Sequence, residues 1–309
     1  MTASVIIVGS YNQDLIWRTT RFPEAGETRT GAFSQGPGGK GFNQAMAAHR
    51  LGGTALFIAA CGADALGDNA RALADSEGLK CRWQICTESA TGNAAIWLND
   101  AGQNQILVDL AANLQLSPAH IRLQADVIRA ALVLLLQQEA NLAASLEAMQ
   151  IAKAAGVYRI VNPAPANADA PALHALADVL TPNESELAAL LQQQGEAISA
   201  EQISQLDAAA LHALARKLPC RTVVITLGER GAVLSSPDGF HECMPPPVTV
   251  ADTTGAGDCF NGALAAELMR GVPLPEACAF AVKAASCKVE RSGAALAMPS
   301  RADITARFG

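Results

Sequence analysis

The chain has 309 residues, of which 50% are hydrophobic and 17% are charged, so it is long enough and apolar enough to bury a large core. This composition excludes an intrinsically disordered chain. A net charge of −7 gives no basic footprint for nucleic acid or for an anionic membrane, so a small anionic ligand needs a local pocket.

Short runs of valine, isoleucine and leucine alternate with helical patterns along the chain. The expected strands lie at residues 5–8, 55–60, 131–136, 157–161, 178–180 and 222–226. The expected helices lie at residues 41–51, 65–77, 142–155, 184–193 and 208–218. Such alternation predicts a Rossmann-like, three-layer α/β fold: a mostly parallel central sheet with helices on both faces and ligands at the carboxyl ends of its strands.

Two segments, residues 15–35 and 91–109, instead alternate polar and apolar side chains, and the turn at residues 99–102 predicts a hairpin. We interpret them as a small antiparallel β lid beside the main sheet. The predicted lid comprises residues 11–36 and 91–112, and the predicted core comprises residues 1–10, 37–90 and 113–309. The alternative is a set of edge strands of the main sheet. Three prolines at residues 245–247 predict a turn before a further strand at residues 248–250.

Cysteine use favours a cytoplasmic protein. The eight cysteines contain no C-x-x-C pair and lie in apolar contexts, as reduced, buried thiols do. No basic or apolar leader precedes the first expected strand, and the apolar run at residues 130–136 is too short for a bilayer, which takes roughly 20 residues. We therefore expect neither a membrane nor a nucleic-acid partner.

A glycine cluster at residues 36–41 has the G-x-G-x-x-G spacing but does not fit a dinucleotide fingerprint. It does not follow the first strand, Pro37 interrupts it, and no acidic strand end lies about 20 residues on. A Walker A loop is excluded because Lys40 is followed by glycine. A glycine loop that opens a helix with Lys40 and Asn43 could hold a polyhydroxylated ligand, and the alternative is a plain turn with a solvated lysine. Asn12 and Asp14 alternate onto one side after the first strand, where they suit sugar hydroxyls.

A second glycine turn, at residues 252–258, precedes a helix with an apolar stripe. Gly255, Ala256 and Gly257 are expected to form its first turn, whose unpaired amides and positive dipole make an anion pocket. Asp258 is unexpected there because a phosphate repels a carboxylate. A general base beside the phosphate would explain it, and the simpler alternative is that Asp258 only complements the helix dipole.

Together, these two glycine motifs resemble the two signatures of the ribokinase-like (PfkB) carbohydrate kinase family, and the resemblance covers nearly the whole chain. Further matching segments are residues 12–14, 22–28, 162–166, 181–186 and 225–228. The resemblance implies an ATP-dependent kinase that phosphorylates a hydroxyl of ribose or a similar pentose. A nucleoside, fructose or a deoxy-sugar acid is the alternative acceptor, and a catalytically silent sugar-binding regulator is the alternative class.

The resemblance also implies roles for individual residues. Asp258 would accept the proton of the sugar hydroxyl, and the amides of Gly255, Ala256 and Gly257 would stabilise the transferring phosphoryl group. The implied sugar-binding residues are Asn12, Asp14, Gly39, Lys40, Asn43, Glu139 and Asp258. The implied nucleotide-binding residues are Asn183, Glu186, Thr226, Leu227, Gly228, Glu229, Arg230, Gly231 and Gly257. The alternative role of Glu139 is to cap the helix that follows it.

Two metal ions are implied by the same resemblance. Asn183 and Glu186 would organise Mg²⁺, largely through water. The residues themselves also predict a capping box with Thr181 as N-cap and Glu184 at N3, and both hold together because that box leaves Asn183 and Glu186 free. A potassium ion beside the anion pocket would be bound by Asp252 and by the backbone carbonyls of Thr254, Lys288, Arg291 and Gly293. Ala297 stands where the family commonly has a hydroxyl ligand, so the oxygen shell is incomplete.

Three further expectations concern packing and assembly. Phe42 is bulkier than the residue usual at its position, and we expect it to pack into the core rather than stack on a base. Val282 stands near the adenine position of the family and leaves adenine to apolar packing. The resemblance also implies a homodimer formed through the lid.

Overall fold

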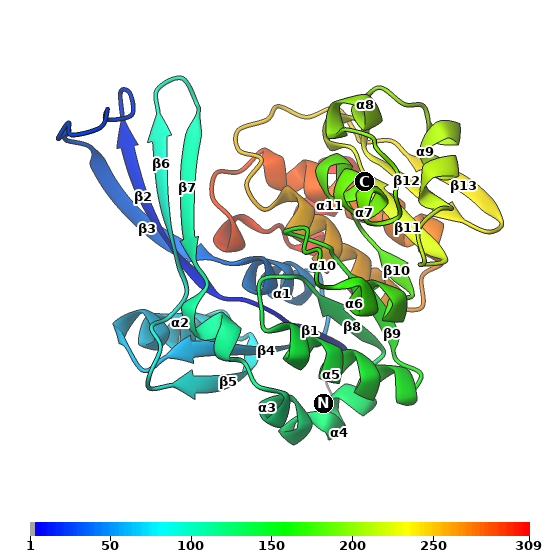
Figure 1. Cartoon of the computed structure of the whole chain (residues 1–309), viewed down its shortest axis with the longest axis horizontal. Helices are drawn as coiled ribbons and strands as arrows, with labels where there is room; N and C mark the ends of the chain where they lie inside the picture. Colours follow the sequence, from blue (N-terminus) through cyan, green and yellow to red (C-terminus); the bar gives the residue numbers. More distant parts are fainter. Residues whose placement is uncertain (1–3) are drawn as a thin grey trace.

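The computed structural model describes residues 4–309, so residues 1–3 of the predicted core lie outside the described part. Its larger sheet has nine strands in the order β13-β12-β11-β10-β9-β8-β1-β4-β5 (Figure 1). Their bounds are β1 Val5–Val8, β4 Ala55–Gly62, β5 Lys80–Cys86, β8 Val133–Leu136, β9 Tyr158–Val161, β10 Val179–Leu180, β11 Thr222–Thr226, β12 Ala232–Ser236 and β13 Gly239–Cys243. Only the pairs β11–β12 and β12–β13 are antiparallel. The predicted, mostly parallel sheet is therefore confirmed.

Helices cover both faces of this sheet. One layer contains α1 Lys40–Arg50, α2 Ala65–Ser76, α10 Ala256–Met269, α11 Leu274–Val289 and α12 Arg301–Phe308. The other contains α3 Pro118–Leu123, α4 Ala125–Arg129, α5 Leu142–Ala154, α6 Pro171–Leu176, α7 Glu184–Gln193, α8 Ala200–Ser204 and α9 Ala208–Ala215. Short 3₁₀ turns are η1 Ala111–Gln115, η2 Gly228–Arg230 and η3 Ala295–Ala297. Among the described residues, no helix combines the length and apolarity that crossing a membrane would need.

Strand β1 shows how the sequence forms two cores. Val5 and Ile7 pack into one core, and Ile6 and Val8 pack into the other. All four side chains are fully buried, because a central parallel strand has helices on both of its faces. The strand predicted at residues 248–250 is wrong: residues 244–250 form neither helix nor strand. Three consecutive prolines directly before it remove the amide donors that would continue a ladder.

The smaller sheet has the strand order β3-β2-β6-β7 and projects from one end of the core (Figure 1). Its strands are β2 Asn12–Thr19, β3 Ala32–Gly38, β6 Asn93–Asn99 and β7 Asn104–Asp109. The hairpin at residues 99–102 is confirmed, and the alternative of edge strands of the main sheet is wrong. Strands β2 and β6 run parallel, so the lid is two antiparallel hairpins joined side by side rather than fully antiparallel.

Register places an aromatic row on one face of the lid. Trp17 pairs with both Phe33 and Trp97, so the three rings share a face. Ile96 pairs with Ile106 on the opposite face. Both faces of the lid therefore carry apolar side chains.

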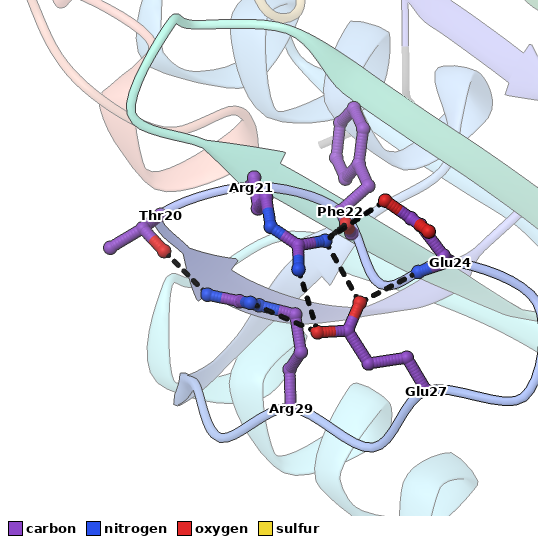
Figure 2. Close-up of polar contacts among 6 residues, drawn as sticks. All are labelled: Thr20, Arg21, Phe22, Glu24, Glu27 and Arg29. Carbon is purple, nitrogen blue, oxygen red and sulfur yellow. Dashed lines mark hydrogen bonds and ion pairs between the residues drawn. The ribbon is translucent and has the colours of Figure 1, made fainter.

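The loop between β2 and β3 is held by ion pairs around Glu27 (Figure 2). Arg21 donates one hydrogen bond to each carboxylate oxygen of Glu27, both at 2.8 Å, and Arg29 donates another at 3.1 Å. Arg29 also reaches the hydroxyl of Thr20 at 2.8 Å. The amide of Glu24 and these guanidinium groups lower the pKa of Glu27 to about 2. The outer end of the lid is thus an ordered turn.

Candidate active site

A polar cavity of about 170 Å³ lies where the strands of the main sheet end and three helices begin. Asn162 and Thr181 follow β9 and β10, and Thr226 ends β11. The lining residues are Lys40, Asn162, Ala164, Thr181, Asn183, Glu186, Thr226, Thr253, Gly255, Ala256, Gly257, Asp258 and Asn261. Residues from both predicted glycine motifs and from the predicted nucleotide side therefore surround one cavity.

The anion-binding turn begins α10. Gly255 is the N-cap, with a left-handed φ of 74° that favours glycine. A Cβ added at Gly257 would meet no atom within 4 Å, so the backbone there is open toward the space it lines. No acceptor is recorded for the amides of Gly255 and Gly257, whereas the amide of Ala256 donates to the Thr253 carbonyl at 3.1 Å. The expected group of three free amides is therefore reduced to the two glycines.

Asp258 is held in place by two buried amides. Asn43 donates to its Oδ2 at 2.8 Å, and Gln44 donates to its Oδ1 at 3.1 Å. Gln44 also donates to Asn162 at 3.1 Å and accepts a hydrogen bond from Gln137. Asp258 is only 6% exposed, and these hydrogen bonds fix the orientation of its carboxylate. A carboxylate that only complements the helix dipole would not require these hydrogen bonds from buried amides.

Sequence reasoning missed Gln44. Its side chain is fully buried in the first turns of α1, between Asn43 and the apolar residues Ala45 and Met46. A glutamine within an otherwise apolar, buried face is the signal that was available. Phe42, next to them, is fully buried and packs edge-on against Tyr11, so its predicted core position is confirmed.

Glu139 links the first strand to α1. Its Oε2 accepts hydrogen bonds from the Ser10 hydroxyl at 2.6 Å and from the amide of Lys40 at 2.9 Å. The alternative that Glu139 caps its own following helix is wrong, because Asn141 is the N-cap of α5. Glu139 instead satisfies the first amide of α1.

Acidic side chains gather around one lysine. Burial, followed by the charges of Glu139 and Asp258, raises the pKa of Asp14 to about 7. Burial opposes the charge of Lys40, but Asp258, Glu139 and Glu186 together raise its pKa. Lys40 thus stays an ammonium group, whereas Asp14 changes its charge near neutral pH. Asn12, which precedes Asp14 on β2, is buried and accepts a hydrogen bond from Asn113 at 2.9 Å.

The N-terminus of α7 is capped differently from the prediction. Asn183 is the N-cap: its Oδ1 accepts from the amide of Glu186, and Glu186 accepts from the amide of Asn183, both at 2.9 Å. The predicted capping box of Thr181 and Glu184 is wrong. The Pro182 carbonyl still accepts a hydrogen bond from Thr226, so the chain remains extended beside β11 and the helix starts later. Burial raises the pKa of Glu186, which also lines the cavity.

Of the predicted nucleotide loop, only Thr226 lines the cavity. Residues Gly228–Arg230 form a 3₁₀ turn that the amide of Leu227 closes by donating to the Gly231 carbonyl at 2.8 Å. Glu229 lies within this turn, and Arg230 points away to the Leu206 carbonyl, 2.8 Å distant. Gly39 is the N-cap of α1, beside the cavity. Val282 is buried in the core against the sheet.

Two of the residues implied to bind potassium already make other contacts. Both carboxylate oxygens of Asp252 accept backbone amides, from Thr254 at 2.9 Å and from Gly293 at 2.8 Å. The Lys288 carbonyl accepts the amide of Arg291 at 2.9 Å, and the Lys288 ammonium donates to the Asp252 carbonyl at 3.0 Å. The Lys288 ammonium thus lies against the backbone of Asp252, a residue implied to bind potassium, and would repel a cation bound beside it.

The magnesium ion implied by the resemblance would lie beside Glu186. No cluster of three or more His, Cys, Asp or Glu side chains that could hold a metal ion occurs within residues 4–309. Mg²⁺ usually needs only one or two carboxylates because substrate phosphates and water complete its shell. Glu186 lines the cavity, but its oxygens accept the backbone amide of Asn183 at 2.9 Å and the side-chain amide of Asn183 at 3.2 Å, so it would contact the ion through water.

Comparison with known proteins agrees with this geometry. A model of the pfkB family of carbohydrate kinases matches residues 2–301. Ribokinase of Mus musculus is 40% identical over 268 residues, which cover 85% of this chain and 81% of that protein. Ribokinase of Schizosaccharomyces pombe is 33% identical over 314 residues, which cover 99% and 98%. The solved structure of Arabidopsis thaliana ribokinase complexed with ribose and ATP superposes with a TM-score of 0.84 at 31% identity, and covers 99% of this chain and 98% of that chain.

Proposed function

This chain belongs to the pfkB family of carbohydrate kinases, and we propose that it transfers the γ-phosphate of ATP to a hydroxyl of D-ribose, giving ribose 5-phosphate. One observation carries the proposal. The Asp258 carboxylate, oriented by two buried amides, lines the same cavity as the open turn of Gly255 and Gly257. A base beside an anion pocket is the arrangement that phosphoryl transfer to a hydroxyl needs.

The chemistry follows from these positions. Asp258 accepts the proton of the attacking hydroxyl, which contributes roughly 10²–10⁴-fold to the rate. The amides of Gly255 and Gly257 and the positive end of α10 stabilise the negative charge on the transferring group. Lys40, which lines the same cavity, adds a positive charge. Asn43 and Gln44 each donate a hydrogen bond to one oxygen of Asp258, and these bonds reduce the repulsion between its carboxylate and the phosphate.

We assign sugar binding to the side of the cavity beneath the lid. Asp14 and Asn12 lie on β2, and the Oδ1 of buried Asn43 has no recorded partner, so it is available to a sugar hydroxyl. Gly39, Lys40 and Glu139 complete this side. The lid, residues 11–36 and 91–112, would cover the sugar and exclude water from the reaction.

Magnesium accompanies ATP in this proposal. Asn183 and Glu186 would hold it through water, and the ion would neutralise charge on the phosphates. Thr226 and Gly257, which line the cavity, would contact the phosphates of ATP, and residues 227–231 would lie beside the rest of the nucleotide, outside the cavity lining. The potassium ion is left out, because the Asp252 carboxylate already accepts two amides and the Lys288 ammonium bonds the Asp252 carbonyl.

We also propose a cytoplasmic homodimer. All eight cysteines are free thiols, as expected of a reducing compartment. Large apolar side chains are exposed on the lid: Trp17, Phe33, Trp97, Ile106, Leu107 and Val108. Patches of this kind mark protein interfaces, and pairing of two lids would cover them.

Release of ADP from Mg·ATP, measured with ribose, deoxyribose, fructose and several nucleosides, tests the activity, with a no-sugar reaction to subtract ATP hydrolysis. We expect ribose to give the highest kcat/KM and a 5-phosphate product by phosphorus NMR. Asp258→Asn should lose about 10²–10⁴-fold in kcat while its affinity for ribose persists in calorimetry. Ribose binding without turnover by the wild type would instead favour the silent regulator.

A further inference from the structure

Lys288 carries a positive charge into the interior behind the anion-binding turn. Its side chain is 0% exposed, and no other lysine is buried among residues 4–309. It stands in the last turn of α11, where its Nζ donates to the Asp252 carbonyl at 3.0 Å. None of the ion pairs in the described chain includes it. Burying an ammonium without a salt bridge is costly, so a functional reason for this position is expected.

The surrounding contacts join Lys288 firmly to the turn. The amides of Ala251 and Asp252 both donate to the Val289 carbonyl, at 2.8 and 3.1 Å. The Asp252 carboxylate accepts the amides of Thr254 and Gly293, on either side of the turn. The end of α11 and the segment that leads into α10 are therefore one rigid unit, and the ammonium is held within it.

The charge of Lys288 acts from behind the cavity. Thr253 and Gly255 line the cavity, but Asp252 and Lys288 do not. The ammonium bonds the carbonyl of the residue directly before Thr253, so it reaches the cavity through the backbone and not by touching a ligand. A fixed charge in this place orients that peptide group and makes the potential at the turn more positive, at no cost in reorganisation during the reaction.

We propose that the Lys288 ammonium is a tethered cation, which supplies the positive charge behind the anion-binding turn and makes phosphoryl transfer independent of potassium. A tethered charge does this permanently, whereas a free ion must be bound from solution. A second cation beside Lys288 would be repelled, and Ala297 has no hydroxyl to help bind one. The inference rests on the proposed kinase activity, and Lys288 is a positioning residue because it acts through the Asp252 peptide.

The first test uses the wild-type protein. Sugar phosphorylation is measured with Mg·ATP in potassium, sodium or tetramethylammonium chloride at equal ionic strength, and melting temperatures are recorded in the same buffers. We expect kcat to agree within about twofold and the melting temperature to show no increment specific to potassium. Stimulation by potassium of about tenfold or more would overturn the proposal.

The second test removes the charge. Lys288→Met keeps the length of the side chain, and Lys153→Met is the matched control, since Lys153 is exposed on α5. We expect Lys288→Met to lower kcat about tenfold or more while the KM for the sugar stays within about twofold. Lys288→Ala, which leaves a cavity, should regain part of kcat and melt higher in potassium than in tetramethylammonium. Wild-type kcat in Lys288→Met without potassium would refute the proposal.

The two proposals fail in different ways. A wild-type protein that phosphorylates no sugar in any salt contradicts the proposed function. The melting temperatures then still decide the role of Lys288: ion-specific stabilisation by potassium of the wild type overturns it, and stabilisation confined to Lys288→Ala supports it. A variant that does not fold leaves the wild-type salt comparison as the deciding measurement.

Discussion

The side-chain amide of Gln44 donates a hydrogen bond to Asp258 Oδ1 at 3.1 Å, and both side chains are buried. Gln44 itself is fixed by Asn162 and Gln137, so a chain of amides reaches from β8 to the proposed base. The second Asp258 oxygen is bound by Asn43 at 2.8 Å. Two side chains of α1 therefore fix the orientation of the Asp258 carboxylate. A sugar hydroxyl must approach it from the cavity that Asp258 lines.

Gln44→Met is expected to reduce kcat by about tenfold to a hundredfold with little change in the KM for the sugar, because the base remains but loses one of its two anchors. Gln84→Met is the control, because Gln84 makes comparable hydrogen bonds on β5, outside the cavity lining. Steady-state kinetics measure kcat and KM for both variants, and a wild-type kcat in Gln44→Met would contradict the role.

We expect Gly257→Ala to lower the activity without lowering the stability. Its Cβ would meet no protein atom within 4 Å and would project into the space where the phosphate is expected. Alanine is a better helix former than glycine by about 1 kcal/mol, so the melting temperature should hold or rise. The activity should fall by about a hundredfold, since one anion-binding amide is obstructed.

Thermal melting and kcat, measured together on Gly257→Ala, test this prediction. Gly271→Ala is a comparison outside the cavity, but its left-handed φ of 78° predicts a loss of stability with normal activity. Full activity in Gly257→Ala would show that this amide does not face the phosphate.

The parts of the site that were predictable from sequence are those set by local chain chemistry. The turn at residues 252–258 and the start of α1 after Gly39 follow from glycine, capping and apolar spacing within one segment. The contact between Gln44 and Asp258 spans 214 positions, and no local pattern encodes it. Glu139 caps α1 rather than its own helix for the same reason. Asn183 rather than Thr181 is the N-cap of α7, because the Pro182 carbonyl pairs with Thr226 of β11 and the helix begins after it. This pairing depends on the tertiary structure and not on the local sequence.

Leu107→Lys tests whether the lid forms the dimer. Leu107 is 77% exposed on β7 and pairs with Ala95, which puts it on the aromatic face of the lid. A charge there should shift the mass measured by light scattering toward that of one chain, because desolvating an unpaired ammonium in an interface is unfavourable. Leu123→Lys is the matched control: Leu123 is 80% exposed but lies on α3, away from the lid. A wild-type monomer, or a dimer that survives in Leu107→Lys, would contradict the lid interface.

Asp14 should make sugar capture depend on pH near neutrality. Burial and the nearby charges of Glu139 and Asp258 raise its pKa from 3.8 to about 7. Above pH 7 the ionised carboxylate accepts hydrogen bonds from sugar hydroxyls with both oxygens, and below pH 7 the added proton removes part of that capacity. We therefore expect kcat/KM for the sugar to fall as pH decreases through about 7, with kcat at saturating sugar affected less.

Ionisation of Asp14 has opposite effects on sugar binding and on stability: it favours binding but lowers the stability of the fold. Because the native state binds the Asp14 proton more tightly than the unfolded chain does, its ionisation destabilises the fold as pH rises from about 4 through about 7. Asp14→Asn should lose affinity for the sugar, flatten the pH dependence of kcat/KM and gain melting temperature relative to the wild type at pH 8 but not at pH 4. Asp109→Asn, at the exposed end of β7, is the control. A kcat/KM profile in Asp14→Asn that still falls through pH 7 would assign the titration to another group of the site.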